Sequence, residues 1–409
     1  MSSSRNNKRA RNAASQDYGP SEIEFYRAQS RSMRHRITEV EDKLAEYNEE
    51  SVPARFKVIL SDLDDHIKAI AVKKLQHLAN MDVRSGEYFK VVNWVETLCR
   101  LPFGKYSSLP VSMTSPNADV STFIRSISQR LDAAVYGHTE CKDHIMRILC
   151  QWITNPMAKG MIIGIQGAAG VGKTSLVKEG ICKALGVPFA FIPLGGASDG
   201  AFLEGHSYTY EGAVPGKMVD VIVRAKCMNP VLFFDETDKI SMTNKGQEVM
   251  NILVHLTDSS QNDKFTDRYF TDIALDFSRS LMIFSFNDVA NISPILLDRM
   301  TVINVAGYNS ADKLKIATRH LIPEILGEFN MAAESITFDD VLIRYIIEET
   351  ESEEGVRNLK RSIHKVVSNV NLQRILHAKE LPWILTREDV DKFMGPSKKS
   401  SAKMLSMYV

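Results

Sequence analysis

Short apolar runs without polar alternation recur between residues 161 and 305. They read MIIGIQ, FAFIPL, VLFFD, LMIFSF and VINV, and stretches with helical spacing of apolar residues separate them. A strand that is apolar on both faces has to be covered on both sides, which is typical of parallel sheets. The pattern therefore predicts an α/β fold, with a parallel five-stranded sheet between layers of helices.

Amphipathic helices are predicted before this region. Residues 23–48 space apolar side chains by four and three positions, a seam that fits either a coiled coil or packing on the same chain. The seam comprises Met33, Ile37, Val40, Leu44 and Tyr47. A second helix is predicted with one face formed by Phe56, Ile59, Leu60, Leu63, Ile67 and Ile70. A third carries Tyr88, Val92, Val95 and Leu98 and ends at the LPFG sequence.

These patterns divide the chain into five segments. Residues 1–21 and 396–409 are polar and have little to bury, so we expect a disordered basic arm and a disordered tail. Residues 22–118 form a helical neck with a Ser- and Pro-rich linker, and residues 119–308 form the α/β domain. In residues 309–395 the strand pattern stops, and three or four helices form a helical lid domain.

Composition limits the class of protein. The chain has 409 residues, and 50 Lys and Arg side chains balance 50 Asp and Glu side chains, which argues against nucleic acid or a membrane surface as partner. Five scattered cysteines without a Cys-x-x-Cys pair argue against a zinc site and favour a reducing compartment. With no apolar run near the roughly 20 residues of a membrane helix, we expect a soluble intracellular protein, cytoplasmic or nuclear.

The sequence GAAGVGKTS follows the first apolar run and precedes a helical pattern. Gly167, Gly172, Lys173 and Thr174 fit the G-x-x-x-x-G-K-[ST] phosphate loop, in which backbone N–H groups converge on phosphate oxygens at a helix N-terminus. Lys173 is expected to reach the β- and γ-phosphates of ATP, and the Thr174 hydroxyl to bind Mg²⁺. Gly170 and Ser175 complete the predicted nucleotide-binding set.

Polar residues end two of the other predicted strands. VLFFD ends in Asp235, and Glu236 follows directly. Asp235 is expected to hold Mg²⁺ through water, while Glu236 polarises the attacking water. Asn287, at the end of LMIFSFN, is a candidate for orienting the same water. Together with the phosphate loop, these residues predict nucleotide hydrolysis.

Further motifs follow in a fixed order, and the set resembles the ATPase module of the Lon-type AAA+ protease family. The likeness covers roughly residues 130–378, and the helices ending in LPFGKYS resemble the helical neck before that module. The motifs are GAAGVGKT, EGHSYTYEGAVPGKM, FFDETDKI, DRYFTDIALDFS, FSFND, PILLDRMTVI, GYNSADKLKIA, HLIP and EEGVRNLKR.

The resemblance implies a hexameric ring with a nucleotide at each subunit boundary. Arg299 matches the arginine that reaches the neighbouring subunit's nucleotide, where a planar cation stabilises charge on the γ-phosphoryl oxygens. Arg357 matches the lid arginine that contacts phosphate within its own subunit. Tyr136 and Gly137 match the segment that packs against adenine. Tyr210 matches the aromatic residue of an axial loop that grips a threaded polypeptide.

The sequence also departs from the family. Glu211 replaces an aliphatic residue next to Tyr210, so six carboxylates near a ring axis would repel acidic segments. Ala168 and Ala169 replace two prolines, with little expected effect on backbone N–H groups. A Ser-Lys protease domain is expected after the lid; Ser397 and Lys398 lie in a polar stretch that offers no surrounding fold. The sequence therefore predicts ATP hydrolysis without peptide-bond cleavage.

Three interpretations of function remain open at this point. The preferred one is a ring that remodels or translocates protein, with a separate protease or an adaptor as candidate partners. The second is a nucleotide-gated structural or assembly ring without processive unfolding, favoured by Glu211. The third is a nucleic-acid motor whose phosphate-binding arm comprises Arg5, Lys8, Arg9 and Arg11, and the neutral net charge argues against it. The KRAR sequence in this arm also fits a nuclear address or a solubilising tail.

Overall fold

The computed structural model describes residues 18–47, 52–78, 81–82, 85–197, 199–210, 212–377 and 381–395. The chain forms two compact units that divide between Cys99 and Arg100. This boundary lies earlier than the one predicted at residue 118, so the Ser- and Pro-rich segment belongs to the second unit. Most of the predicted basic arm, with Arg5, Lys8, Arg9 and Arg11, and all of the predicted tail lie outside the described residues.

The first unit is helical, but the single helix predicted over residues 23–48 is wrong. The structure has α2 (Pro20–Ala28) and α3 (Arg31–Tyr47), separated at Gln29, whose backbone is extended. Ser30 starts the new helix, because its hydroxyl accepts a hydrogen bond from the Met33 N–H at 3.3 Å and its carbonyl accepts one from the Arg34 N–H at 3.0 Å.

The second predicted helix is also interrupted. It divides into α4 (Ala54–Leu60) and α5 (Asp65–Leu78), because Ser61 turns the chain and its hydroxyl donates to the Val58 carbonyl at 2.6 Å. The predicted apolar face is wrong at its N-terminal end, where Phe56, Ile59 and Leu60 are exposed. The buried side chains are Val58, Leu63, Ile67 and Ala71. Helix α6 (Gly86–Arg100) ends where predicted and buries Val91, Trp94, Val95 and Leu98.

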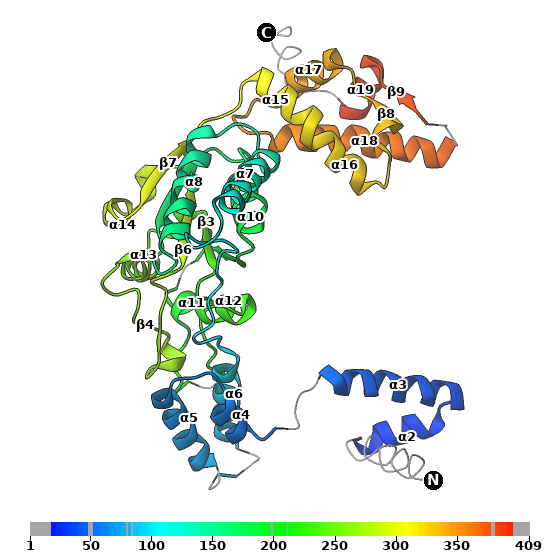
Figure 1. The fold of residues 1–409 in the computed structure, drawn as a ribbon. Helices are drawn as coiled ribbons and strands as arrows, with labels where there is room; N and C mark the ends of the chain where they lie inside the picture. Colours follow the sequence, from blue (N-terminus) through cyan, green and yellow to red (C-terminus); the bar gives the residue numbers. More distant parts are fainter. Residues whose placement is uncertain are drawn as a thin grey trace. The chain divides into compact units, whose positions relative to one another are not determined.

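The five apolar runs form the predicted parallel sheet. They are β1 (Ile162–Gly167), β2 (Phe189–Pro193), β3 (Val231–Asp235), β6 (Leu281–Phe286) and β7 (Thr301–Val305). Their order is β2-β3-β6-β1-β7, and every neighbouring pair is parallel. Figure 1 labels β3, β6 and β7 of this sheet. Because β3, β6 and β1 are neighbours, the chain segments that leave their carboxyl ends meet at one edge of the sheet.

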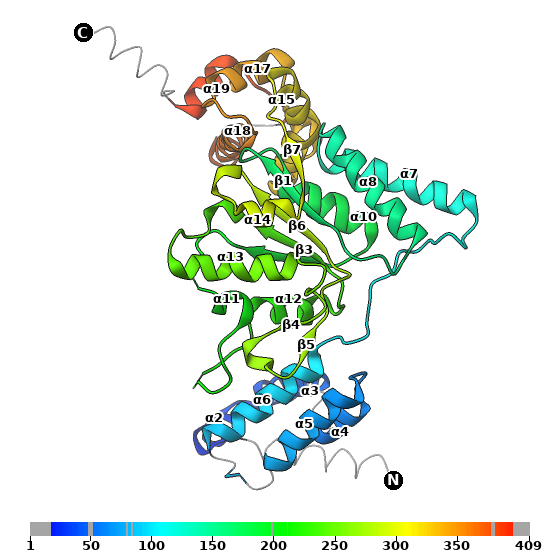
Figure 2. The same cartoon turned by 90° about the vertical axis from the view of Figure 1, so that its left-hand side faces the viewer.

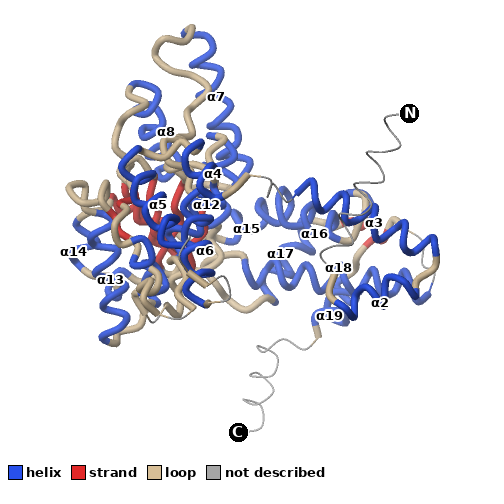
Figure 3. Tube along the Cα trace, turned by 90° about the horizontal axis from the view of Figure 1, so that it is seen from below, coloured by secondary structure: helices blue, strands red, loops and turns tan. Residues whose placement is uncertain are grey.

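Helices cover both faces of this sheet. On one face lie α7 (Asn117–Ala134), α8 (Thr139–Thr154) and a continuous helix made of α9 (Lys173–Ser175), the π-helical stretch η1 (Leu176–Cys182) and α10 (Lys183–Leu185). Their apolar side chains form one core with strand residues such as Ile163, Phe233 and Ile283. Helix α13 (Asn244–Thr257) lies on the opposite side of the sheet from α7 and α8 (Figure 3).

Short elements complete the α/β part of the chain. Its remaining helices are α11 (Ala201–Glu204), α12 (Lys217–Ala225) and α14 (Pro294–Asp298). An antiparallel pair, β4 (Phe265–Thr266) and β5 (Ala274–Leu275), flanks the single turn η3 (Arg268–Phe270). Two further single turns are η2 (Thr237–Lys239) and η4 (Val289–Asn291).

The lid is more elaborate than predicted. The described chain has five α-helices here rather than three or four: α15 (Ser310–Ile316), α16 (Ile322–Glu328), α17 (Asp340–Glu349), α18 (Arg357–His377) and α19 (Arg387–Met394). A π-helical stretch, η5 (Ala317–Leu321), joins the first two, and a turn, η6 (Ala333–Ser335), precedes a parallel pair, β8 (Ile336–Thr337) and β9 (Trp383–Ile384). These elements gather around their own core at one end of the second unit (Figure 2).

We expect Phe234→Ala to lower the free energy of unfolding by about 3–5 kcal/mol, because it opens a cavity in the sheet core. The Phe234 side chain is 0% exposed, and its ring stacks on Phe284 with centroids 4.6 Å apart. Phe191 on the edge strand β2 is 40% exposed, so Phe191→Ala should cost about 1 kcal/mol. Urea denaturation followed by circular dichroism measures both, and equal losses would contradict this account of the core.

Candidate functional site

The turn after β1 holds two glycines in left-handed backbone conformations. Gly170 has a φ of +82° and Gly172 a φ of +94°, values that side chains other than glycine rarely allow. A Cβ at Gly170 would also lie 3.0 Å from the Cβ of Arg357. The glycines therefore give the turn its curl and let the lid approach it closely.

Lys173, the first residue of α9, points back across this turn. Its Nζ donates to the carbonyl oxygens of Gly167 and Ala168, the latter at 3.2 Å, and to Asn287 Oδ1 at 2.7 Å. Burial lowers the pKa of Lys173, while the nearby carboxylate of Asp235 opposes that shift. A half-buried ammonium held by neutral oxygens is well placed to exchange them for an anion.

The end of β3 positions two carboxylates differently. The Ser285 hydroxyl on β6 donates to Asp235 Oδ1, and the Leu194 N–H donates to the Asp235 carbonyl at 2.8 Å. Glu236 has a φ of +56°, a left-handed conformation that is uncommon outside functional sites. Its carboxylate forms an ion pair with Lys239 in the turn η2.

The loop after β2 packs tightly against one side of the Glu236 carboxylate, whose side chain is otherwise 47% exposed. A Cβ at Gly195, in the loop after β2, would lie 2.2 Å from Glu236 Oε2. Asp238 Oδ2 accepts hydrogen bonds from the N–H groups of Asn287 at 3.1 Å and Asp288 at 3.2 Å. These contacts fix the end of β6 beside the end of β3. Gly195, Asp238, Lys239 and Ser285 were missed in the sequence analysis; the i, i+3 spacing of Glu236 and Lys239 was the one available signal.

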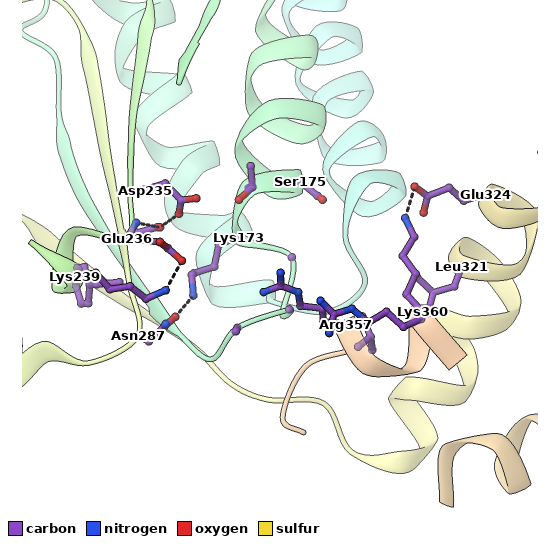
Figure 4. Close-up of a pocket in the computed structure, with 18 of the residues that line it drawn as sticks. Lys173, Ser175, Asp235, Glu236, Lys239, Asn287, Leu321, Glu324, Arg357 and Lys360 are labelled. Carbon is purple, nitrogen blue, oxygen red and sulfur yellow. Dashed lines mark hydrogen bonds and ion pairs between the residues drawn. The ribbon is translucent and has the colours of Figure 1, made fainter. Parts of the chain in front are cut away.

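Residues of the phosphate loop, the ends of β3 and β6, and the lid together line a cavity of about 690 Å³. Figure 4 shows Lys173, Asp235, Glu236 and Asn287 on one side and Arg357 reaching in from the lid on the other. Of the residues predicted for nucleotide binding or hydrolysis, the lining includes Gly170, Gly172, Lys173, Thr174, Ser175, Asp235, Glu236, Asn287 and Arg357.

The lid contributes more basic residues than the sequence analysis named. Lys360, Arg361 and His364 on α18 also line the cavity, and their spacing from Arg357 places all four on one helical face. Lys360 pairs with Glu324 at 2.8 Å (Figure 4). The Val356 N–H donates to the Gly170 carbonyl at 3.1 Å, so the start of α18 contacts the phosphate loop directly.

The lining residues fit magnesium and a triphosphate. Within the described chain, no group of three or more His, Cys, Asp or Glu side chains is arranged to hold a metal alone. Mg²⁺ is usually bound by one or two carboxylates together with substrate phosphates and water, so the Thr174 hydroxyl and Asp235 are a sufficient protein contribution. The cationic groups around them suit the phosphates.

Comparisons with known proteins agree with this geometry. Residues 163–308 match the family model described as "ATPase family associated with various cellular activities (AAA)". The chain is 33% identical over 342 residues to a Lon protease homolog of Acanthamoeba polyphaga mimivirus, which covers 81% of this chain and 32% of that protein. It is 34% identical over 382 residues to the Lon protease of Desulfosudis oleivorans, covering 93% of this chain and 44% of that protein.

The chain carries an AAA ATPase domain and is similar in sequence to Lon proteases. A third relative, the Lon protease of Clostridium acetobutylicum, is 32% identical over 376 residues, 91% of this chain and 46% of that protein. The chain thus spans between a third and a half of the length of these relatives. None of the helices in the described residues combines the length and apolar character needed to cross a lipid bilayer.

Tyr136 and Gly137 lie outside the main cavity. They line a second cavity of about 560 Å³, together with His138 and Tyr308, which both contact Val171 of the phosphate loop. Tyr308, which follows β7, organises this place: its hydroxyl donates to the Val171 carbonyl at 2.9 Å and lies 2.7 Å from His138 Nε2. The phosphate loop is therefore contacted by Tyr308, in the segment that joins β7 to the lid, and by Val356 of the lid itself.

Arg299 is not brought to the phosphate loop of its own chain. It follows α14 and is not part of the described lining of the main cavity. Its guanidinium donates to the Val254 carbonyl and pairs with Asp258 Oδ2 at 3.0 Å, both at the C-terminal end of α13. The location suits a residue that acts elsewhere than in its own site.

Tyr210 lies in the loop between Gly205 and Gly216, and its side chain is 67% exposed. The loop is closed at its base by a hydrogen bond from the His206 N–H to the Val214 carbonyl at 3.2 Å. Glu211 lies outside the described residues.

We expect Gly195→Ala to displace the Glu236 carboxylate, because the new methyl group would overlap Oε2. That carboxylate is the flexible end of its side chain, so the fold should survive, while ATP turnover falls about 10-fold or more. Nucleotide affinity, measured by calorimetry, should stay within a factor of two to three. Gly327→Ala is the matched control, since a Cβ there meets no atom within 4 Å. Equal turnover in the two variants would contradict the tight packing around Glu236.

Proposed function

We propose that this Lon-type domain hydrolyses ATP and uses the hydrolysis to remodel or translocate protein in a hexameric ring. The observation that carries the proposal is the convergence of Lys173, Asp235, Glu236 and Asn287 on one cavity that the lid's Arg357 also enters.

The phosphate loop would bind the nucleotide. Gly170 and Gly172 let the loop curl, so that its backbone N–H groups would bind phosphate oxygens at the N-terminus of α9. The Lys173 ammonium would give up the carbonyl oxygens it contacts and bind the β- and γ-phosphates. Thr174 and Asp235 would hold Mg²⁺, which supplies charge neutralisation of the phosphate oxygens.

Glu236 would activate the attacking water. A carboxylate accepts the water's proton as the oxygen attacks phosphorus, and Asn287 holds the water in line through its amide. Glu236 pairs with Lys239, so the carboxylate must loosen that ion pair to act as a base. Lys239 is therefore proposed to restrain hydrolysis until the site is filled.

The angle of the lid would depend on which nucleotide the site holds. Arg357 enters the cavity from α18, and the adjoining Val356 binds the phosphate loop through Gly170. Contact of Arg357 with phosphate before hydrolysis, and its loss afterwards, would change the angle of the lid. The adenine would pack near Tyr136 and Gly137, next to Tyr308 at the other end of the loop.

Hydrolysis would require a neighbouring subunit. Arg299 lies away from its own cavity, which supports a role in trans, where its guanidinium stabilises charge on the γ-phosphoryl oxygens. In a ring, the contact with Asp258 would be exchanged for the neighbour's phosphate.

The proposed substrate is a polypeptide. The exposed ring of Tyr210 suits non-specific packing against a chain drawn through the ring. Glu211 beside it favours basic or polar segments over acidic ones. The expectation that residues 1–409 cut no peptide bond stays a prediction, which a casein-degradation assay tests. A separate protease or an adaptor stays a possible partner.

The second candidate is a nucleotide-gated assembly ring without processive unfolding. Glu211 favours it, because a ring of carboxylates weakens an apolar grip. It differs from the first in one measurable way: its ATP turnover is indifferent to unfolded protein. The nucleic-acid alternative depends on a basic arm that lies outside the described residues, and the neutral net charge argues against it.

We expect Lys173→Ala to lose ATP binding, and Glu236→Gln to keep binding while turnover falls about 10²–10⁴-fold, the usual contribution of a general base. Nucleotide binding and phosphate release measure the two effects. Lys183→Ala is the control, because Lys183 lies on the same helical segment and its side chain is 67% exposed. Wild-type turnover in both site variants would refute the assignment.

We expect Arg299→Ala to bind ATP normally but to hydrolyse it about 10³-fold more slowly. Asp258→Ala removes the partner within the chain and should leave turnover within twofold, which separates a role in trans from a structural ion pair. Mixing Arg299→Ala with Lys173→Ala subunits should restore part of the activity, because some boundaries then combine an intact loop with an intact arginine. No recovery on mixing would contradict a shared site.

A further inference from the structure

The sequence motif DRYFTDIALDFS, residues 267–278, has no role in the hydrolysis proposed above. Its first three residues are Asp267, which caps the turn η3 (Arg268–Phe270) between β4 and β5, and the first two residues of that turn, Arg268 and Tyr269. This hairpin lies beside α11 and α12, the helices that flank the Tyr210 loop (Figure 2). The motif and the loop are more than fifty residues apart in sequence and adjacent in the fold.

Asp267 is a fully buried carboxyl group at the base of the Tyr210 loop. It is 0% exposed. Its Oδ1 accepts a hydrogen bond from the Tyr269 N–H at 2.8 Å, which is an ordinary cap of its own turn. Its Oδ2 accepts one from the Gly216 N–H at 2.8 Å, 51 residues away, which no cap requires. Burial raises the pKa of Asp267 to about 6.

The two ends of the loop approach each other too closely for side chains at this point. A Cβ at Gly205 would lie 2.6 Å from the Gly216 nitrogen and 2.9 Å from Asp267 Oδ1. A Cβ at Gly216 would lie 2.1 Å from the Leu203 carbonyl oxygen, and Gly205 has a φ of +75°. Glycine at both positions lets the two loop ends lie directly on the buried carboxyl group.

The two residues after Asp267 contact the same loop or its first flanking residue. Arg268 pairs with Glu204 at 3.0 Å, immediately before the loop begins. The Tyr269 ring packs edge-on against the Tyr208 ring, with centroids 5.8 Å apart, inside the loop. Three consecutive side chains therefore contact the start, the interior and the end of the Tyr210 loop.

We propose that residues 267–269 form a clamp that positions the Tyr210 loop, with Asp267 as its positioning residue. The clamp joins the loop to the β4–β5 hairpin, so the two move as one body. Because Tyr210 itself is exposed, force on its ring has to reach the domain through the base of the loop. The functional part of this inference rests on the proposed grip of Tyr210 on protein, whereas the clamp itself does not.

Hydrogen exchange of the full chain tests the clamp without reference to activity. Asp267→Ala removes both acceptors, and Asp267→Asn leaves one carbonyl oxygen for two N–H groups. We expect the Gly216 and Tyr269 amides to exchange about 10-fold faster or more in these variants, with β1, β3 and β6 unchanged. Asp272→Asn, at an exposed position in the same hairpin, is the matched control. Unchanged exchange at Gly216, or faster exchange throughout the sheet, overturns the clamp.

Unfolding of a tagged model protein tests the consequence. Asp267→Asn should lower ATP-driven unfolding at least 10-fold, as Tyr210→Ala does, while kcat and KM for ATP without protein stay within twofold of wild type. If Tyr210→Ala stops unfolding and Asp267→Asn does not, the clamp does not position the loop and the inference fails. If Asp267→Asn loosens the loop and neither variant affects unfolding, the clamp stands and the proposed protein grip fails.

Discussion

The parallel alignment of β3, β6 and β1 is the constraint on which the rest of the structure depends. It brings the residues after three separate strands to one edge of the sheet, where Lys173 contacts Asn287 and Ser285 contacts Asp235. Each contact joins neighbouring strands and β6 contributes to both, so a shift of β6 by a single residue would break both. The buried aromatic and aliphatic core on either side of the sheet holds this alignment.

The lid depends on the same edge. Two separate places contact the phosphate loop, Tyr308 just before the lid and Val356 just before α18 within it. Between them the lid has a hydrophobic core of its own, so it can tilt as a unit about these two contacts. A nucleotide bound at the loop would touch both contacts, which makes the geometry of the lid sensitive to what the loop holds.

The fold was predictable where the signal is local. Apolar strands report their burial directly, and the phosphate loop carries its chemistry in consecutive residues. The breaks at Ser30 and Ser61 were missed because a single serine hydroxyl outweighed helical periodicity on either side. Gly195, Lys239 and Asp267 were missed because their importance lies in neighbours brought near by the fold. The roles of Arg299, Arg357 and Tyr210 came from family resemblance, and their positions in one chain are compatible with those roles.

In an unassembled chain, the salt bridge with Asp258 holds the Arg299 guanidinium. In the proposed ring, the same guanidinium would contact the nucleotide of a neighbouring subunit. When a neighbouring subunit docks, the Arg299 guanidinium would exchange the Asp258 carboxylate for a phosphate of higher charge. It would not have to lose a full hydration shell. ATP hydrolysis would then depend on assembly, and subunits too dilute to assemble would not hydrolyse ATP. Cells that hold such a protein below its association threshold would keep it silent without any inhibitor.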